Sequence, residues 1–594
     1  MKLNALISFL VLIPILSLVS SCSSRTDKNG GKGNSLQAKN PEQVVVWELS
    51  DPEMLNPLIT TEANADNIMW SMFQALEQID FKTLDVVPVL AESRPIIEKT
   101  PKGGMSLTYE IRKEARWANG SPVTAKDVEF TIKACFNPAL NNPAIKETMN
   151  FISDFKLYPE DPRKLTFLCD SLYFLVETGC GGFQIMPEYF YDPNGWMKNY
   201  NVHDLIRNGQ AFKNDSNIIK FANDMSSEKR LREGKFISGS GPYNLESWTP
   251  NKQLVLKKKT SYWGDSLAET IPYMGAYPLK LIYSTINDQI SAVEALKVGD
   301  LDVIYSVLPK AFMELKKNPG ITEKFNLYTP ELLSYYFIGM NCKSKLLRSV
   351  KTRIALTYLC DVDKIIETVY YGLAKRITGP ILSSDKKDYN TDLSPYPFDP
   401  QKARTLLSED GWKDTNGDGI LDKVIDGEKT EFTISFTINS GSATRKAIGL
   451  IFMEEARKAG IKVNLVEQEL NIYLNNLKKH QVEMFISAWI ASPVGNDLTQ
   501  IWKSDAAVPG GNNFANFTDP RCDSLLDAAR IELDDNKRAI LHKRFQVLIH
   551  EQAPFIFMYT PTERLAISKK FTNAEPSVMR PGFCPSLFKL AGKD

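Results

Sequence analysis

The length of the chain constrains its fold most, because 594 residues are too many to bury around one hydrophobic core. We therefore expect two or three lobes. Apolar residues make up 43% of the chain and charged residues 24%, which is ordinary for a globular protein and argues against a fibrous one. Lysine plus arginine equals aspartate plus glutamate at 71 each, so no excess positive charge is present to collect nucleic acid.

The N-terminal segment differs from the rest of the chain. The apolar run LISFLVLIPILSLVSS is too short to be read as a spanning helix and is typical of a secretory signal. It ends directly before Cys22, in a pattern that resembles the bacterial lipobox, whose cysteine is acylated. An ordinary signal peptide with an incidental Cys22 is the alternative. We predict a lipoprotein signal peptide over 1–21, a lipid anchor on Cys22, and a flexible polar tether over 22–41.

Seven further cysteines follow Cys22, and their spacing matches neither a C-x-x-C pair nor a zinc motif. An odd number leaves at least one thiol unpaired in an oxidising compartment. A bridge between Cys169 and Cys180 stays open. The expected role of most of these cysteines is that of small buried hydrophobic residues.

Helical and strand patterns alternate irregularly along the chain, which predicts a mixed α/β architecture. VTAKDVEFTIKACF (123–136) predicts a helix that Thr124 caps and whose apolar residues share one face. DPQKARTLLSEDGW (399–412) predicts a second helix that begins after Asp399 and ends at Gly411. EFTISFTI (431–438) alternates as a half-buried strand does.

The segment GWKDTNGDGILDK (411–423) has part of the ligand pattern of a calcium loop. Its weak candidate ligands are Asp414, Asn416, Asp418 and Asp422. An EF-hand also needs a second helix and a bidentate glutamate, whereas this segment leads into a strand and has Ile425 at the glutamate's position. Asn, Asp and Gly also favour such a turn through local hydrogen bonds without metal. We therefore predict a structural turn and no metal.

Motifs of enzymes lack their required context in this chain. The four histidines (203, 480, 542 and 550) show no paired metal-binding spacing, and neither GSGPY nor NSGSAT forms a nucleophile elbow. GCGGFQ has Gln184 where a dinucleotide loop needs its third glycine. Acid pairs stay open, because any large protein offers them. We expect a protein that is not an enzyme and has no cofactor.

Several motifs occur in an order that resembles the family 5 extracellular solute-binding proteins, which include the oligopeptide, dipeptide and nickel receptors of ABC importers. The first is the long stretch from LAESRPIIEK to DVEFTIKACFNP (90–138). GSGPYNLESWTPNKQLVLKKKTSYWG, SAVEALKVGDLDV, SVKTRIALTYLCDVDKIIETVYYGLA and YPFDPQKARTLLSEDGW follow in the family's order. The resemblance extends over about residues 42 to 575.

The resemblance implies an α/β, two-lobed fold of the periplasmic-binding-protein type (type II, the large class with an extra inserted domain), with a hinge between the lobes. On this basis lobe I comprises residues 42–90, 235–333 and 556–594. Residues 91–234 form the inserted domain, and residues 334–555 form lobe II. The ligand is then expected in a cleft between the lobes.

The resemblance also selects three stretches as walls of this cleft: NADNIMWSMFQALEQID, LLSYYFIGMN and FISAWIASPVGND. In peptide receptors of the family, an aspartate three residues after a tryptophan pairs with the peptide's amine. Here Trp489 is followed by Ser492, which cannot neutralise an ammonium, and Asp497 lies five residues further on. The predicted ligand-binding residues are Gln74, Tyr335, Tyr336, Asn341, Trp489 and Ser492.

The predicted function is that of a membrane-tethered receptor that captures a small solute, with a peptide favoured, and delivers it to an ABC permease and ATPase complex. We expect a monomer that binds no nucleic acid and that its lipid holds at a bacterial membrane, on the periplasmic or cell-surface side. A non-transport lipoprotein receptor or a peptide-holding chaperone on the same fold is the alternative, because a fold does not determine function.

Overall fold

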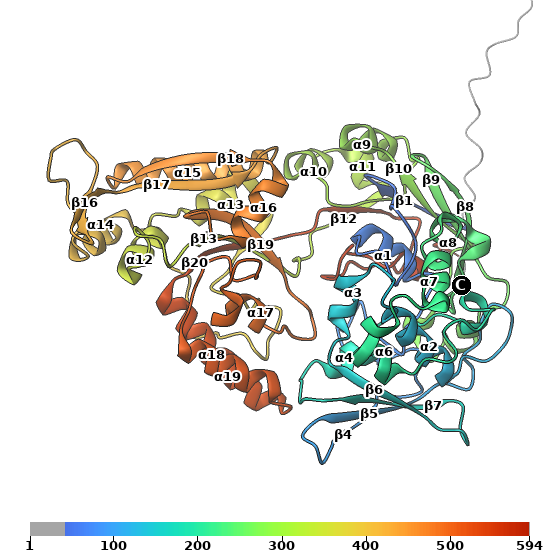
Figure 1. The fold of residues 1–594 in the computed structure, drawn as a ribbon. Coiled ribbons are helices and arrows are strands. Elements are labelled where there is room, and N and C mark those ends of the chain that lie inside the picture. Colours follow the sequence, from blue (N-terminus) through green and yellow to red (C-terminus); the bar gives the residue numbers. More distant parts are fainter. Residues whose placement is uncertain (1–41, 593–594) are drawn as a thin grey trace, which may run out of the picture. The chain divides into compact units, whose positions relative to one another are not determined.

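The structure is a computed structural model that describes residues 42–592 (Figure 1). The predicted signal peptide over 1–21, the tether over 22–41 and the acylated Cys22 lie outside the described residues. No helix among the described residues is long and apolar enough to cross a membrane.

A seven-stranded sheet, in the order β12-β21-β11-β1-β10-β9-β8, gathers strands from both ends of the described chain. Its strands are β1 (Gln43–Glu48), β8 (Tyr243–Thr249), β9 (Gln253–Lys258), β10 (Lys280–Thr285), β11 (Val303–Ile304), β12 (Phe325–Tyr328) and β21 (Leu565–Ser568). β1 lies at the centre and is parallel to both of its neighbours, β10 and β11. Such a central strand is buried on both faces, which explains its continuous apolar run VVVW.

A four-stranded antiparallel sheet and a cluster of short helices occupy the segment between β3 and β8 (Figure 1). The sheet has the order β4-β5-β7-β6 and comprises β4 (Ile96–Lys99), β5 (Met105–Glu110), β6 (Ile152–Leu157) and β7 (Lys164–Cys169); β2 (Glu77–Ile79) and β3 (Val86–Pro88) pair as a hairpin before it. The helices of the first half are α1 (Ala63–Met69), α2 (Ala125–Cys135), α3 (Pro143–Thr148), α4 (Val176–Gly181), α5 (Glu188–Tyr191), α6 (Val202–Asn208), α7 (Ser216–Met225), α8 (Glu228–Arg232), α9 (Gln289–Lys297), α10 (Pro309–Lys316) and α11 (Pro319–Thr322). The helix predicted over 123–136 is confirmed as α2, which begins after Thr124 with a capping box to Asp127.

A six-stranded sheet, in the order β14-β20-β13-β19-β17-β18, organises the second half of the chain. Its strands are β13 (Ser334–Met340), β14 (Ala374–Arg376), β17 (Thr433–Asn439), β18 (Lys462–Gln468), β19 (Met484–Ile490) and β20 (Phe555–Pro561). Its helices are α12 (Val350–Tyr358), α13 (Val362–Tyr370), α14 (Pro400–Glu409), α15 (Ala443–Lys458), α16 (Leu470–Lys478), α17 (Thr499–Trp502), α18 (Pro520–Ile531) and α19 (Asp535–Gln552). The predicted helix after Asp399 and the strand in EFTISFTI are confirmed as α14 and β17.

Two hydrophobic clusters cover the two faces of the six-stranded sheet. Ile338 and Met340 point to one face, where α12 to α15 pack. Tyr335 and Phe337 point to the other, where α16 to α19 pack. Successive side chains of a strand alternate between faces, so neighbouring residues of β13 enter different cores.

The chain passes from the seven-stranded to the six-stranded sheet between β12 and β13 and returns between β20 and β21. Lobe I is predicted to resume at residue 556, whereas β20 belongs to the six-stranded sheet and extends to Pro561. β20 pairs with β13, and Phe557 lies opposite Phe337. The return therefore falls within residues 562–564. The other predicted domain boundaries stay predictions.

The acidic segment over 411–423 is a turn between α14 and a hairpin of β15 (Asp422–Ile425) and β16 (Glu428–Glu431). Asp414 accepts hydrogen bonds from the backbone N–H groups of Gly417 (2.7 Å) and Gly419 (2.9 Å). Asp422 accepts a hydrogen bond from Thr415 and forms an ion pair with Lys429 at 3.3 Å. Local hydrogen bonds of this kind hold such turns without metal. Among residues 42–592, no group of three or more His, Cys, Asp or Glu side chains is arranged to hold a metal ion.

All seven described cysteines are free thiols. Cys135, Cys169, Cys180, Cys360 and Cys522 are buried, and Cys342 and Cys584 are half-buried. Cys135 and Cys180 belong to the core beneath the first two sheets, where they pack as small hydrophobic side chains.

Candidate functional site

A pocket of about 340 Å³ is lined by residues between 48 and 283 together with the C-terminal segment 579–586. No residue of the segment 334–555 lines it. Its walls come from the end of β1, from α1, from the β2–β3 hairpin, from α4 with its C-cap Gly182, and from the segments around 262 and 273–275. Aromatic side chains contribute much of the lining: Trp70, Phe81, Tyr262, Tyr273, Tyr283 and Phe583.

Three carboxyl groups line this pocket, and each accepts a hydrogen bond from an aromatic side chain. Tyr305 donates to Glu48 over 2.7 Å, and Tyr109 donates to Glu77 over 2.9 Å. The indole N–H of Trp70 donates to Asp66 over 3.1 Å. Among the described residues, none of the three carboxyl groups is in an ion pair.

Glu48 and Glu77 are deeply buried, with exposed fractions of 6% and 1%. Burial raises the pKa of Glu48 from 4.5 to about 7, against the smaller opposing effect of the hydrogen bond from Tyr305. Burial, followed by the charge of Glu177, raises the pKa of Glu77 to about 8. Desolvation disfavours the charged form of a carboxyl group, so both groups carry a proton readily near neutral pH. Asp66 is exposed at the rim of the pocket.

Two buried acceptor atoms of the pocket have no hydrogen-bond donor among residues 42–592. They are Oε1 of Gln74 and Oε1 of Glu77. The amide nitrogen of Gln74 donates to the hydroxyl of Tyr262 over 2.8 Å, which fixes the amide with its oxygen unpaired. Buried polar groups in native proteins usually have partners. The predicted site residue Gln74 therefore lies in a pocket with unused acceptor capacity.

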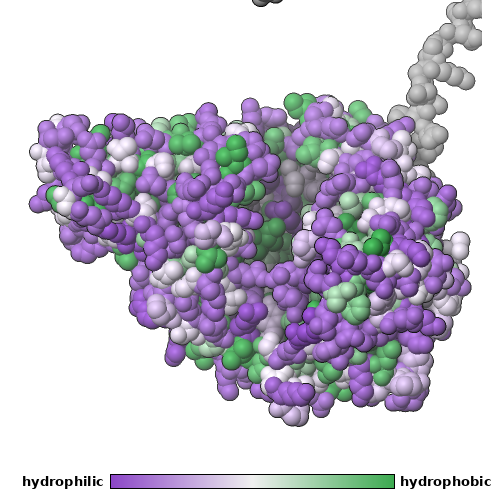
Figure 2. Space-filling view, in the orientation of Figure 1, coloured by the Kyte–Doolittle hydropathy of each residue, from purple (hydrophilic) through white to green (hydrophobic). Residues whose placement is uncertain are grey.

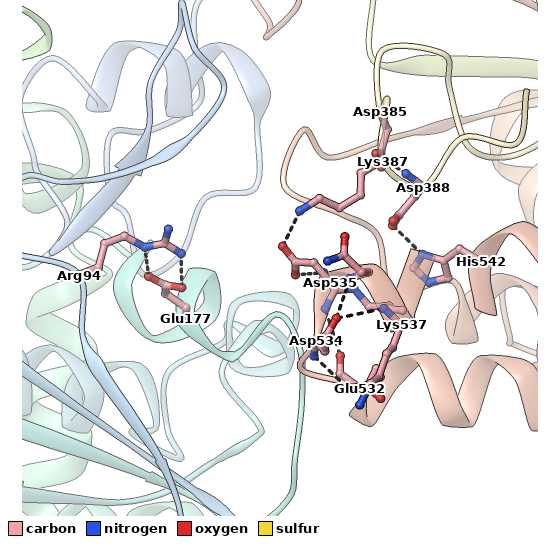
Figure 3. Close-up of polar contacts among 12 residues, drawn as sticks. Arg94, Glu177, Asp385, Lys387, Asp388, Glu532, Asp534, Asp535, Lys537 and His542 are labelled. Carbon is pink, nitrogen blue, oxygen red and sulfur yellow. Dashed lines mark hydrogen bonds and ion pairs between the residues drawn. The ribbon is translucent and has the colours of Figure 1, made fainter. Parts of the chain in front are cut away.

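The positive charge of Arg94 lowers the pKa of Glu77, but Arg94 itself is paired with another carboxylate. Its guanidinium donates two hydrogen bonds to Glu177 of α4, both of 2.6 Å (Figure 3). The backbone of α4 also approaches Glu77 closely. A Cβ atom on Gly181 would lie 2.3 Å from Oε2 of Glu77, so a larger residue at this contact would displace the Glu77 carboxyl group.

The predicted residues of β13 and β19 are divided between the two faces of the six-stranded sheet. Tyr335 lies opposite Trp489 in the strand register, so the two share a face. Tyr335 is fully buried, whereas Trp489 is half-buried and stacks on Phe514 with ring centroids 5.2 Å apart. The indole N–H of Trp489 has no partner among the described residues. Tyr336 faces the other core and stacks on Tyr559.

Asn341 and Ser492 make local structural contacts. The amide of Asn341 donates to the carbonyl oxygens of His480 and Val482. The backbone N–H of Ser492 donates to Asn496 over 2.8 Å. Neither residue lines the pocket described above. As ligand-binding residues, both stay predictions.

Asp497, the carboxylate next along the chain from Ser492, is already engaged. It forms an ion pair with Arg530 at 3.4 Å and accepts a hydrogen bond from Thr499 over 2.5 Å. Its side chain is 9% exposed. A ligand's ammonium would have to compete with Arg530 for it.

A histidine–carboxylate pair joins His542, near the middle of α19, to Asp388. Nδ1 of His542 lies 2.6 Å from Asp388, and both side chains are buried (Figure 3). The ring of Phe174 packs against the imidazole, with centroids 6.3 Å apart. In a Ser-, Thr- or Cys-based catalytic site the hydroxyl or thiol lies within hydrogen-bond reach of the histidine. The contacts described for this pair are those of a packed structural group.

Figure 2 shows that this face of the protein is hollowed between the region of β19 and the region of α1. The surface around the hollow is mainly hydrophilic, with hydrophobic side chains at its floor. Asp66 of α1 and Trp489 of β19 thus belong to the two elements that flank the hollow in this view. Such a concave site with apolar walls and a few polar groups is typical of small-ligand binding.

Comparison with known proteins identifies the family. Residues 85–508 match the bacterial extracellular solute-binding proteins, family 5 Middle. The chain belongs to this family. The resemblance predicted from the order of the motifs is therefore confirmed, and the family consists of extracellular solute-binding proteins.

Relatives and solved structures extend the match over most of the chain. The oligopeptide-binding protein AppA of Bacillus subtilis (strain 168) is 26% identical over 95% of this chain and 94% of its own length. The dipeptide-binding protein of Escherichia coli (strain K12) is 24% identical over 88% of this chain and 90% of its own length. A crystal structure of NikA from Brucella suis with Fe(III)-EDTA covers 92% of this chain and 99% of its own, with 20% identity and a TM-score of 0.73. The predicted two-lobed α/β fold is confirmed.

Sequence reasoning missed Glu48, Asp66 and Glu77. Asp66 and Glu77 lie in the stretch NADNIMWSMFQALEQID, in which Gln74 is the predicted site residue. A usable signal was present at Glu77, because this acid stands inside the apolar run MFQALEQI. An acid in such a run is buried when the run forms part of a core, and buried acids often have a function.

Proposed function

We propose that the protein is the receptor of an ABC importer, which captures a peptide between its two lobes and delivers it to a permease and ATPase complex. Family membership over residues 85–508 is the observation that carries this proposal. Relatives named for oligopeptide and dipeptide binding support a peptide as the ligand. We propose further that the protein acts as a monomer and by binding alone, without catalysis.

In this proposal the pocket beside α1 forms the wall of the binding site in lobe I, and β13 and β19 carry the wall in lobe II. The pocket's aromatic side chains offer broad apolar surface to varied side chains of a peptide. Tyr335, Tyr336, Asn341, Trp489 and Ser492 are the proposed contacts from lobe II. Closure of the lobes on the ligand by a hinge would complete the site.

The test of this function is retention of peptides by the purified protein. A mixed pool of synthetic peptides of three to five residues is incubated with the protein, unbound peptide is removed by gel filtration, and retained peptides are identified by mass spectrometry. We expect a subset of the pool to be retained at one peptide per protein. Retention of no peptide at any length would contradict the proposed function.

We also propose that Cys22 carries the lipid that holds the protein at a bacterial membrane. The small residues before Cys22 and the polar stretch after it support this anchor. Replacing Cys22 with alanine is expected to move the protein from the membrane fraction to the soluble fraction, because stable anchoring needs the acyl chains. Immunoblots of the two fractions measure this. A Cys22→Ala variant that stays with the membrane as firmly as the wild type would contradict the anchor.

A further inference from the structure

We propose that the pocket lined by Glu48, Asp66 and Glu77 binds a positively charged, hydrogen-bond-donating group of the ligand, an ammonium or a guanidinium. This inference rests on the proposed function, because it names the chemical class of the peptide that the site selects. The cation could belong to the peptide's N-terminus or to a basic side chain, and the experiment below separates the two.

The charges that line the pocket are the first argument. Three carboxyl groups face it, and the only cationic side chain among its lining residues is Arg580, which is exposed. Glu48 and Glu77 are almost completely buried, and each accepts one hydrogen bond from a tyrosine hydroxyl. A buried carboxylate is stable only when a cation or several donors compensate its charge. Within residues 42–592 no such cation is paired with either group, so a bound cation would supply it.

The unpaired acceptors are the second and independent argument. Gln74 and Glu77 line the same pocket, and Oε1 of each is buried without a donor among the described residues. Tyr262 holds the amide of Gln74 by its nitrogen, so the oxygen is the atom that remains for a ligand. An ammonium has three donors and no acceptor, and a guanidinium has five donors and no acceptor. Both groups can donate hydrogen bonds to these two unpaired oxygen atoms.

The aromatic lining agrees with the same class of ligand. Trp70, Tyr283 and Phe583 contribute ring surface to the pocket. Aromatic faces attract cations within about 6 Å and also cover the methylene groups of a lysine or arginine side chain. A carboxylate on the ligand would instead meet three carboxyl groups, with the exposed Arg580 as the only cationic side chain among the residues that line the pocket.

A metal ion is the other cation that carboxylates attract. Metal ligation needs several oxygen atoms converging at about 2.0–2.6 Å. In the part of the chain that the structure describes, no three such side chains are arranged in this way. The pocket's volume of about 340 Å³ and its aromatic walls suit an organic cation better.

The test uses one peptide pool of three to five residues, made in four versions. The N-terminus is free or acetylated, and one fixed position holds lysine or the neutral norleucine. Competition for the purified protein is measured by mass spectrometry of the retained peptides. We expect at least a tenfold preference for the versions that carry the decisive cation over the version with none. Dependence on acetylation would assign the N-terminus, and dependence on lysine would assign the side chain.

Variants locate the preference in the pocket. Glu48→Gln and Glu77→Gln keep the shape of each side chain, but glutamine cannot become negatively charged when a cation binds, so each should reduce the tenfold preference to less than threefold. Glu455→Gln is the matched control. Glu455 is a buried carboxylate of α15, paired with Lys458 at 3.0 Å and distant in sequence and core from the pocket. The preference should be unchanged in this variant.

A small probe makes the outcome independent of the peptide. Hexylammonium at 10 mM should raise the melting temperature of the wild type more than hexanol does, and the Glu48→Gln/Glu77→Gln double variant should lose this difference. Equal retention of all four peptide versions would overturn the inference and leave the proposed function standing. Retention of no peptide, together with a shift by hexylammonium, would overturn the function and support the inference. No retention and no shift would overturn both.

Discussion

The empty wild-type protein is expected to lose stability between about pH 5 and pH 8, and the Glu77→Gln variant is expected to lose clearly less. Burial raises the pKa of Glu77 from 4.5 to about 8, so the folded state keeps a proton that the unfolded state releases over this range. The free energy of unfolding therefore falls as the pH rises from about 5 to 8. Glutamine does not titrate, so the variant lacks this contribution. Melting temperatures of both proteins at pH 5, 6.5 and 8 measure it.

The neighbours of Glu77 decide how large this effect is. Glu177 raises the pKa further, whereas the hydrogen bond from Tyr109 and the charge of Arg94 lower it. The difference in melting temperature between Glu77→Gln and the wild type should grow by at least about 2 °C from pH 5 to pH 8, since about 1 kcal/mol shifts a domain of 150–250 residues by 2–4 °C. Glu455→Gln, which loses an ion pair instead of an unpaired carboxyl group, should show no such growth. A constant difference across the pH range would contradict the burial of an unpaired Glu77.

The fold could be predicted from the sequence because its signals are local and occur in order. The capping box at Thr124, the punctuated helix after Asp399 and the alternating strand at 433–439 each depend on neighbouring residues only. The acidic turn was also interpreted from local chemistry, and Asp414 makes the predicted kind of side-chain to backbone hydrogen bonds. Motifs in a known order then identified the family without any long-range contact.

The site could be predicted only in part, because its residues meet through tertiary structure. The pocket joins Glu48, Glu77, Tyr262 and the segment 579–586, and more than five hundred residues of chain separate the first of these from the last. No local sequence pattern predicts that the C-terminal segment closes a pocket beside α1.

The dependence on tertiary structure also explains why neighbouring residues of β13 face different cores. Tyr335 and Tyr336 are adjacent in the sequence, but one enters the core with Phe337 and the other stacks on Tyr559 of β20, more than two hundred residues later. The strand was visible in the sequence, and the alternation of its faces follows from strand geometry. Which face meets a ligand depends on the helices that cover each side, and these are supplied by distant segments.

Replacing Trp489 with alanine is expected to weaken peptide binding by about 10- to 100-fold, at about 1.4 kcal/mol per factor of ten, and to leave the stability of the empty protein largely intact. Trp489 is half-buried, and its indole N–H has no partner among the described residues, so the side chain retains both surface and a donor for a ligand. One of its faces stacks on Phe514, and the indole nitrogen itself is buried, so the exposed part of the ring is the surface that a ligand meets first. Titration calorimetry with a retained peptide and thermal unfolding of the empty protein measure the two effects.

Trp502 provides the matched control, because it belongs to the same hydrophobic cluster as Trp489 and is completely buried. Its ring packs against Phe545 and Phe555, so Trp502→Ala leaves a cavity and should cost about 3–5 kcal/mol of stability. Trp489→Ala removes a ring that is only half enclosed, so less packing is lost. If both variants lowered the melting temperature equally, Trp489 would be a core residue, and its loss of binding would reflect a damaged lobe. If Trp489→Ala changed neither property, the ring would lie outside the binding site, and the wall of the cleft would have to be sought among other residues of β13 and β19.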